Sequence, residues 1–300
     1  MAEGGATLLI DGSSLAYRAY HAIPEIFAPD GVTATNAVHG FLNFLSRLIP
    51  DRRPARLWVA LDADWRPAFR VEALPGYKAH RVAGPDDPAD PVEPQIALII
   101  EVLGAYGIST AACPGFEAED AISAIATRTD RRVEVVTGDR DLFQLARHPH
   151  VLVLYTLRGV SELANVDQAW INAKYGIPGD RYMDYAILRG DPSDGLPGVA
   201  GIGEKTASDL LRKYGSLDAI LAARDLSPSV RVKLVRAAEY LVGARRVVAL
   251  AEDCPVEGGD GAIPNGPMHT DEVRALEARY GIAGPIERLT AAVRIASATA

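Results

Sequence analysis

Short apolar runs alternate with longer amphipathic segments over the first half of the chain. The apolar runs lie at residues 6–10, 57–61, 133–136 and 151–155. Runs of this length, bounded by polar or turn residues, are typical of buried strands in a parallel sheet. The segments between them, at residues 37–49, 95–106 and 118–126, repeat apolar side chains at helical spacing, with Asn36 as a candidate N-cap for the first. The pattern predicts an α/β core with a mainly parallel central sheet flanked by helices.

Beyond residue 167 the strand pattern disappears and helical periodicity continues. Helices are predicted at residues 168–175, 182–188, 204–214, 217–222 and 229 to about 250. We therefore predict a boundary near residue 180, with a core over residues 1–180 and a helical subdomain over residues 181–300. Two stretches rich in proline interrupt the pattern, at residues 84–94 and 255–267. The second reads as a linker before a final helical stretch.

Acidic residues follow three of the apolar runs, at Asp11, Asp62 and Asp139. Because the carboxyl ends of parallel strands share one edge of a sheet, these side chains are expected to meet in one crevice. Further acids cluster in three compact motifs at residues 117–120, 138–141 and 190–198. Taken alone, the first of these could cap a helix and the last could be a turn. Three strand-end acids together with these motifs are harder to explain as capping.

No histidine or cysteine lies within the acidic motifs. The complete set of acids comprises Asp11, Asp62, Glu117, Glu119, Asp120, Asp139, Asp141, Asp191 and Asp194. Oxygen ligands alone favour hard cations such as Mg²⁺ or Mn²⁺ over zinc. So many carboxylates would repel one another without cations, and a pair of ions is the known arrangement for in-line hydrolysis of a phosphodiester.

Composition and charge indicate the class of protein and its cellular environment, but they do not identify its binding partner. The chain has 300 residues, of which 48% are hydrophobic and 23% charged, as in an ordinary globular protein. Its two cysteines, Cys113 and Cys254, cannot form a disulfide framework or a four-cysteine zinc site, so we expect a reduced, cytoplasmic setting. No apolar run approaches the roughly 20 residues that span a bilayer, so no membrane partner is expected. The net charge of −8 leaves nucleic acid possible, because a basic face can coexist with an acidic metal centre.

The motifs resemble, in order, those of the 5′ nuclease family, which includes the 5′–3′ exonuclease domain of bacterial DNA polymerase I, phage 5′ exonucleases and flap endonucleases. The matching stretches are residues 8–22, 60–62, 69–70, 76–81, 114–120, 137–145 and 190–207. The resemblance extends from residue 8 to about residue 225. It implies a PIN-like α/β core followed by a helix-two-turn-helix at about residues 183–225.

The resemblance also implies roles for individual residues. Asp11, Asp62, Glu117, Glu119 and Asp120 would surround one metal ion, and Asp139, Asp141, Asp191 and Asp194 the other. Two or more Mg²⁺ or Mn²⁺ ions are therefore implied, with a K⁺ ion at the helix-two-turn-helix loop. Glu119 stands where polymerase-linked members commonly have aspartate, so we expect a shifted ligand rather than a lost one.

Basic and backbone groups would hold the nucleic acid. The resemblance assigns charge stabilisation on the phosphate to Arg18, Arg70, Lys78 and Arg81, within or near an arch over about residues 66–94 through which the 5′ strand passes. Tyr77 is a candidate for stacking on an unpaired base. Candidates for gripping the duplex backbone at a helix N-terminus are Gly198, Gly201, Gly203, Lys205 and Thr206.

The implied activity is that of a structure-specific 5′–3′ exonuclease and 5′-flap endonuclease acting in replication and repair. Its expected partners are DNA with 5′ flaps, nicks or 5′ ends and RNA–DNA hybrids, bound by a monomer that resembles a stand-alone 5′ nuclease. Two alternatives remain open at this point. A PIN-type ribonuclease would share the strand-end acids and lack the hairpin at residues 198–205, whereas a non-catalytic protein binding DNA junctions would keep the hairpin and lose acids.

Overall fold

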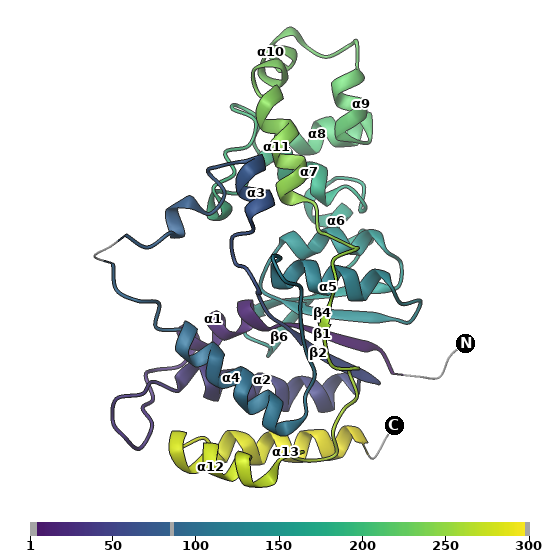
Figure 1. Ribbon diagram of the computed structural model, residues 1–300. Coiled ribbons are helices and arrows are strands. Elements are labelled where there is room, and N and C mark those ends of the chain that lie inside the picture. Colours follow the sequence, from purple (N-terminus) through teal and green to yellow (C-terminus); the bar gives the residue numbers. More distant parts are fainter. Residues whose placement is uncertain (1–4, 85–86, 298–300) are drawn as a thin grey trace.

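A twisted, mostly parallel sheet forms the centre of the computed structural model, which describes residues 5–84 and 87–297 (Figure 1). Within these residues the sheet has seven strands in the order β6-β5-β4-β1-β2-β3-β7. Their bounds are β1 Thr7–Asp11, β2 Arg56–Ala60, β3 Thr110–Ala112, β4 Val133–Thr137, β5 Val151–Arg158, β6 Glu162–Val166 and β7 Glu257–Gly258. The strands β6 and β7 pair antiparallel at the two edges, and the five between them are parallel. The predicted α/β class is confirmed.

The register of the central strands determines the edge of the sheet at which the strand-end acids lie. Asp11 is paired with Ala60 in β2, and the preceding Ile10 is paired with Val136 in β4. Since these strands run in the same direction, Asp11, Asp62 and Asp139 leave the sheet at the same edge. Side chains along β1 point alternately to its two faces, so Leu9 belongs to one core and its neighbours to the other.

Helices cover both faces of the sheet (Figure 1). One face packs against α1 (Gly12–Ala22), α2 (Asn36–Arg52) and α4 (Glu93–Tyr106). The other face packs against α5 (Ala118–Thr127) and η2 (Asp141–Arg147), with α6 (Gln168–Tyr175) beyond them. The short α3 (Ala68–Ala73) and η1 (Ala79–Arg81) lie in the segment between β2 and α4.

The N-cap expected at Asn36 is wrong by one residue. Asn36 is already helical, and Thr35 occupies the cap position without a side-chain cap bond. The amide of Asn36 instead donates to the carbonyl oxygens of Tyr20 (3.0 Å) and Ile23 (3.3 Å). Its polar group is therefore used to tie α2 to the end of α1.

The helical subdomain stands at one end of the molecule (Figure 1). It contains α7 (Tyr182–Arg189), η3 (Pro192–Asp194), α8 (Glu204–Tyr214), α9 (Leu217–Ala222), α10 (Pro228–Arg236) and α11 (Ala238–Val248). The single helix predicted from residue 229 to about 250 is two helices, broken at Ala237. The break redirects α11 against α3 and α7, where Tyr240 donates its hydroxyl to the carbonyl oxygen of Ile187 at 2.9 Å.

The C-terminal segment returns to the core, which corrects its assignment to the helical subdomain. Residues 257–258 form β7 beside β3, so the stretch at 255–267 is an edge of the sheet as well as a connection. The last two helices, α12 (Thr270–Tyr280) and α13 (Ala283–Ser297), pack on α4 and α2 respectively (Figure 1). No helix in the described residues is both long and apolar enough to cross a bilayer.

Candidate active site

Asp11 at the end of β1 and Asp62 just after β2 are held by local hydrogen bonds at the carboxyl edge of the sheet. Asp11 accepts from the backbone nitrogen of Ser14 at 3.1 Å and from the hydroxyl of Thr137 at 2.6 Å. Asp62 accepts from the backbone nitrogen of Ala118 at 2.7 Å. These bonds join the ends of β1, β2 and β4 to the start of α5. Each carboxylate is therefore fixed by backbone or side-chain donors from neighbouring elements.

A polar pocket of about 230 Å³ opens at this edge. The acids that line it are Asp11, Asp62, Glu117, Glu119 and Asp139, and the cations are Lys78 and Arg81. Burial, together with the charges of Asp139 and Asp62, raises the pKa of Asp11 to about 7. The fold thus gathers carboxylates that are 128 residues apart in sequence into one cavity with two basic side chains.

The acids expected at the second metal ion form a second group in and beside this pocket, made up of Asp139, Asp141, Asp191 and Asp194. Asp139 accepts from the backbone nitrogen of Asp141 at 2.9 Å, and Asp141, Asp191 and Asp194 are nearly buried. Burial raises the pKa of Asp141, and the charges of Asp139, Asp194 and Asp191 raise it further. The turn at Asp191 is closed by hydrogen bonds from the backbone and hydroxyl of Ser193 at 3.0 Å and 2.5 Å. The second group is therefore crowded with negative charge.

Arg70 does not face a substrate, which corrects the role expected for it. Its side chain is completely buried and its guanidinium contacts three carboxylates. The distances are 2.6 Å to Glu117, 2.6 Å to Glu119 and 2.8 Å to Asp120. A guanidinium enclosed in this way cannot reach a phosphate. Arg70 instead neutralises and positions the carboxylates at the start of α5.

Tyr77 is also buried, so the expectation that it stacks on an unpaired base is wrong for this structure. It is 2% exposed and donates its hydroxyl to Glu117 at 2.5 Å. The exposed aromatic side chain in this region is Trp65, at 40%, whose carbonyl oxygen accepts from Lys78 at 3.5 Å. Sequence reasoning missed Trp65 because this residue lies between the matching stretches.

Lys78 and Arg81 connect the arch segment to the two acid groups. Lys78 pairs with Glu117 through its amino group, and its backbone nitrogen donates to the carbonyl oxygen of Asp194 at 2.9 Å. Arg81 pairs with the carboxylate of Asp194 at 2.8 Å and is partly exposed. Burial raises the pKa of Asp194 to about 6, although both cations oppose that shift. Both basic residues therefore line the acidic pocket.

Arg18 lies next to this pocket rather than in it. It projects from α1 beside Gly138, where an added Cβ atom would come within 2.9 Å of the guanidinium. Together with Ser14 and Tyr17 it lines an adjoining pocket of about 430 Å³. Glycine at position 138 therefore keeps room for Arg18 beside the end of β4.

The donor chemistry of the acidic pocket fits divalent cations, although its side chains do not form a closed ligand shell. Among residues 5–84 and 87–297, no three acidic, histidine or cysteine side chains converge closely enough to hold a metal ion. Glu117 and Asp194 are engaged by Lys78 and Arg81. The raised pKa of buried Asp11 shows that its negative charge is poorly compensated. An oxygen-only, charge-excess pocket of this kind suits Mg²⁺ or Mn²⁺.

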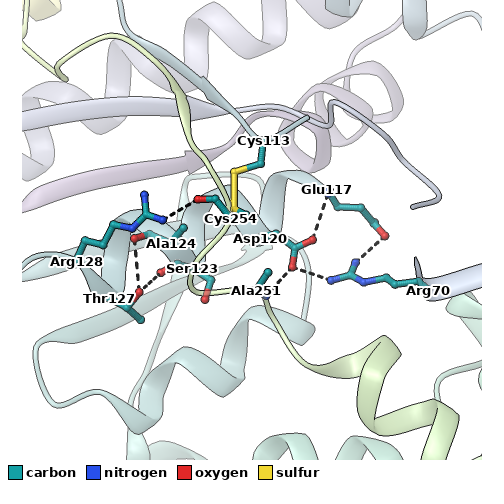
Figure 2. Close-up of a disulfide and its surroundings, with 10 residues drawn as sticks. All are labelled: Arg70, Cys113, Glu117, Asp120, Ser123, Ala124, Thr127, Arg128, Ala251 and Cys254. Carbon is teal, nitrogen blue, oxygen red and sulfur yellow. Dashed lines mark hydrogen bonds and ion pairs between the residues drawn. A yellow bond between two sulfur atoms is a disulfide. The ribbon is translucent and has the colours of Figure 1, made fainter. Parts of the chain in front are cut away.

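Asp120 is a structural member of the acid cluster. It is completely buried and accepts from Arg70 and from the backbone nitrogens of Glu117 (3.2 Å) and Ala251 (2.8 Å), as Figure 2 shows. The bond from Ala251 ties the start of α5 to the chain that leaves α11. The expected role of Asp120 as a ligand is therefore not supported by its hydrogen bonds.

A disulfide reinforces the same connection. Cys113, just after β3, is joined to Cys254, and both are buried (Figure 2). Arg128, which follows α5, donates to the carbonyl oxygen of Cys254 at 2.7 Å. Reduced cysteines were expected because two are too few for a disulfide framework, and that expectation is wrong. Nothing in the sequence marks a pair 141 residues apart as meeting beside the acid cluster.

The glycine-rich loop between η3 and α8 is shaped by left-handed backbone. Gly198 (φ 69°) and Gly201 (φ 77°) adopt positive φ angles that side chains disfavour, and Gly203 precedes the first turn of α8. Lys205 is highly exposed and pairs with Asp209 at 2.7 Å. The carbonyl oxygen of Gly201 accepts from Lys233 of α10 at 2.8 Å. One carbonyl that a K⁺ ion could use is therefore already in contact with an ammonium group.

Family models match both parts of the chain. The model described as a 5′–3′ exonuclease N-terminal resolvase-like domain matches residues 6–176, and the model described as a 5′–3′ exonuclease C-terminal SAM fold matches residues 177–268. The chain belongs to the 5′–3′ exonuclease family. The family expected from the motifs is confirmed.

Relatives of this 5′–3′ exonuclease family member include proteins of similar length and longer polymerases. A 5′–3′ exonuclease of Streptomyces coelicolor is 47% identical over 94% of this chain and 98% of its own. A second, from Mycobacterium tuberculosis, is 42% identical over 95% of this chain and 97% of its own. DNA polymerase I of Mycobacterium bovis is 41% identical over 90% of this chain, which corresponds to 30% of the polymerase.

Solved structures share the fold at low sequence identity. A bacteriophage T5 flap endonuclease solved with DNA and metal ions has a TM-score of 0.62 and 16% identity, over 97% of this chain and 99% of its own. Flap endonuclease-1 from Methanococcus jannaschii has a TM-score of 0.63 and 17% identity, over 98% of this chain and 92% of its own. The expected fold, a mostly parallel central sheet followed by a helical C-terminal part, is confirmed.

Proposed function

We propose that this 5′–3′ exonuclease family member hydrolyses phosphodiester bonds at 5′ flaps and 5′ ends of DNA, including RNA primers, with the help of Mg²⁺ or Mn²⁺. The observation that carries the proposal is the pocket at the carboxyl edge of the sheet. It combines carboxylates from β1, α5 and the segments that follow β2 and β4 with two cations from the arch segment. A site for hydrolysing a polyanion needs both kinds of group.

The proposed metal-binding residues fall into two sets. The pocket acids Asp11, Asp62, Glu117 and Glu119 would hold one ion, and Asp139, Asp141, Asp191 and Asp194 the other. Bound divalent cations would supply a nucleophilic water and stabilise the charge on the leaving oxygen. Arg70 keeps Glu117 and Glu119 in place by its two 2.6 Å contacts.

Lys78 and Arg81 are proposed to meet the phosphate. In the structure their partners are Glu117 and Asp194, so both cations already stand at the pocket without a substrate. A phosphate can replace these carboxylates as partner by a change of side-chain rotamer. Arg18, which lines the adjoining pocket with Ser14, is proposed to contact the nucleic acid there.

The 5′ single strand is proposed to pass through the arch formed by about residues 66–94. Residues 85–86 of this segment lie outside the described residues. Trp65 replaces Tyr77 in the proposed stacking role because it is exposed and its backbone carbonyl oxygen accepts from Lys78. Tyr17 of α1, which lines the pocket, donates its hydroxyl to Asp90 and so ties the later part of the arch segment to α1.

The duplex is proposed to bind at the loop before α8. The backbone amides of Gly203 and the first turn of α8 form the N-terminal end of that helix, where anions are stabilised. Thr206 and Lys205 lie in the same first turn, and Lys205 can extend into solvent from its exposed pair with Asp209. A K⁺ ion at Gly198 and Gly201 remains part of the proposal, as does a monomeric state.

The hairpin also bears on the two alternatives. A PIN-type ribonuclease was expected to lack this loop, and a non-catalytic junction-binding protein was expected to lack acids. The chain has both the loop and the acid-lined pocket. The combination favours a nuclease that holds a duplex while it cleaves.

A labelled 5′-flap duplex tests the proposal. We expect cleavage near the base of the flap with Mg²⁺ or Mn²⁺, none with EDTA, and much slower cleavage of the same flap strand without its complement. A flap carrying a 5′ ribonucleotide segment should be cut at a similar position. Cleavage that persists in EDTA, or that is confined to internal RNA, would contradict the proposal.

A further inference from the structure

The helical subdomain carries an open groove of about 670 Å³ between α9, α10 and α11. Its apolar lining consists of Leu221, Leu226, Leu234, Val235, Leu241 and Val242. Three of these form a buried floor, whereas Leu221, Val235 and Val242 are 44%, 69% and 69% exposed. A concentration of exposed branched side chains around an apolar floor is typical of a surface that binds a partner. We call this feature the α9–α11 groove.

The α9–α11 groove faces away from the loop proposed to hold the duplex. On α10, Lys233 points to that loop and donates to the carbonyl oxygen of Gly201 at 2.8 Å. Arg231 and Val235 are each two residues from Lys233, which at about 100° per residue puts them on the opposite side of the helix. Apolar side chains also gain nothing from contact with a phosphate backbone. The groove is therefore separate from the duplex-binding side of the subdomain.

Positive charge surrounds the apolar lining. Arg231, Arg245 and Arg246 line the α9–α11 groove, and Asp218 is the acid that lines it. Asp218 is already paired with Arg245. Arg231 is held in place because it donates to the carbonyl oxygens of Ala223 and Arg224 at 3.1 Å and 2.9 Å. The rim thus has excess positive charge in a chain whose net charge is −8.

The geometry points to the α9–α11 groove as a docking site for an acidic, amphipathic helical segment of a partner protein. Apolar side chains three or four residues apart on the segment would contact the floor, and its carboxylates would face the arginine rim. Charge complementarity selects this occupant over a second copy of the chain, which presents the same positive rim. The groove is lined by α9, α10 and α11, and Figure 1 shows α9 and α10 at the end of the molecule away from the sheet, so a docked segment leaves the pocket at the sheet edge open.

A peptide titration tests this docking site. The probe is a fluorescein-labelled peptide of roughly four helical turns, made of glutamate with leucine at helical spacing, followed by anisotropy against the full chain. We expect a Kd below about 100 µM that rises with salt. A peptide with glutamine in place of glutamate should bind at least about ten-fold more weakly, and one with alanine in place of leucine should not bind measurably.

Two matched variants locate the binding. Val242→Asp puts a negative charge into the α9–α11 groove and should raise the Kd about ten-fold or more. Val232→Asp changes a comparably exposed apolar residue of α10 outside the groove and should leave the Kd within about two-fold. Both positions are exposed, so both variants should fold, and circular dichroism checks this. Flap cleavage should be unchanged in both.

Four outcomes would overturn the inference. The acidic peptide does not bind, or the two variants bind it equally, or the glutamine peptide binds as tightly as the acidic one. If instead Val242→Asp weakens duplex DNA binding as strongly as a change in the loop before α8, the groove belongs to the DNA footprint and the partner helix is ruled out. Failure of the peptide test leaves flap cleavage untouched, so the two proposals fail separately.

Discussion

Arg70 and Asp120 form a completely buried ion pair, with Nη2 of the arginine 2.8 Å from Oδ1 of the aspartate. The same guanidinium contacts Glu117 and Glu119. One cation therefore offsets three carboxylates at the start of α5, and its position decides where two of the pocket acids lie. The geometry of the proposed catalytic pocket therefore depends on a completely buried residue.

Removing that cation should destabilise the protein strongly. In Arg70→Met, Glu119 and Asp120 lose their buried partner and Glu117 keeps only Lys78, so a cost of about 3 to 5 kcal/mol in the free energy of unfolding is expected. Urea denaturation measures it. Arg81→Met is the matched control, because the Arg81 side chain is partly exposed and its pair with Asp194 should contribute about 1 kcal/mol or less. Equal, small losses in both variants would refute the positioning role.

The stability of the metal-free protein should depend on pH in an unusual direction. Burial raises the pKa of Asp11 to about 7 and that of Asp194 to about 6, both from an ordinary value of 3.8. Between about pH 4 and 7 the folded state therefore binds protons that the unfolded chain has lost. In EDTA, the free energy of unfolding should fall as the pH rises from about 5.5 to 8.

Divalent cations should reverse this trend, because they compete with protons for the same carboxylates. The rise in Tm on adding Mg²⁺ should be larger at pH 8 than at pH 6. Asp11→Asn, which cannot titrate, should flatten the pH dependence in EDTA. A stability that increases with pH in EDTA would show that these carboxyl groups are not held in the protonated form.

Reduction of the disulfide should lower the Tm. The bond between Cys113 and Cys254 closes a loop with a sequence separation of 141 residues, for which the chain-entropy model gives about 4 to 5 kcal/mol. Cys113→Ala, Cys254→Ala and the double variant should therefore have similarly lowered Tm values without reductant. A phosphine reductant should lower the Tm of the unchanged protein and leave the variants alone. Two free thiols per chain in the unreduced, denatured protein would contradict this.

Lys205 should contribute to duplex binding without regard to base sequence. Lys205→Ala should weaken binding to different duplexes alike and reduce the slope of log K against log salt by about one unit for one lost phosphate contact. Arg274→Ala is a suitable control, since Arg274 is a comparably exposed cation on α12, next to the core. An unchanged slope in Lys205→Ala, or a loss that varies with sequence, would rule out the proposed grip.

The strand-end acids were predictable because a buried run of about five apolar residues defines a parallel strand, and its direction fixes which end carries Asp11 or Asp62. The short β3 was not, since Thr110–Ala112 has no distinctive apolar pattern. The amphipathic α12 and α13 could have covered either part of the chain. Their return to α4 and α2 depends on the whole fold rather than on local sequence.

The roles predicted for Arg70 and Tyr77 were wrong for the same physical reason. Arg70 and Tyr77 belong to a motif rich in basic and aromatic residues, which suggests contact with nucleic acid. Their burial follows from three carboxylates on α5 converging on the same point, and such a convergence has no signature in a sequence. The break between α10 and α11 at Ala237 could not be predicted either, because neither glycine nor proline marks it in the sequence.

The central claim is that the carboxylates at the sheet edge serve catalysis by holding divalent cations. Its most direct test is the single-turnover rate of flap cleavage by Asp141→Asn at saturating Mg²⁺, measured beside flap binding in Ca²⁺. Removing one buried carboxylate from the crowded second group should slow cleavage by at least about 100-fold and leave binding nearly unchanged, because the phosphate contacts remain. Cleavage at close to the unchanged rate would contradict the account.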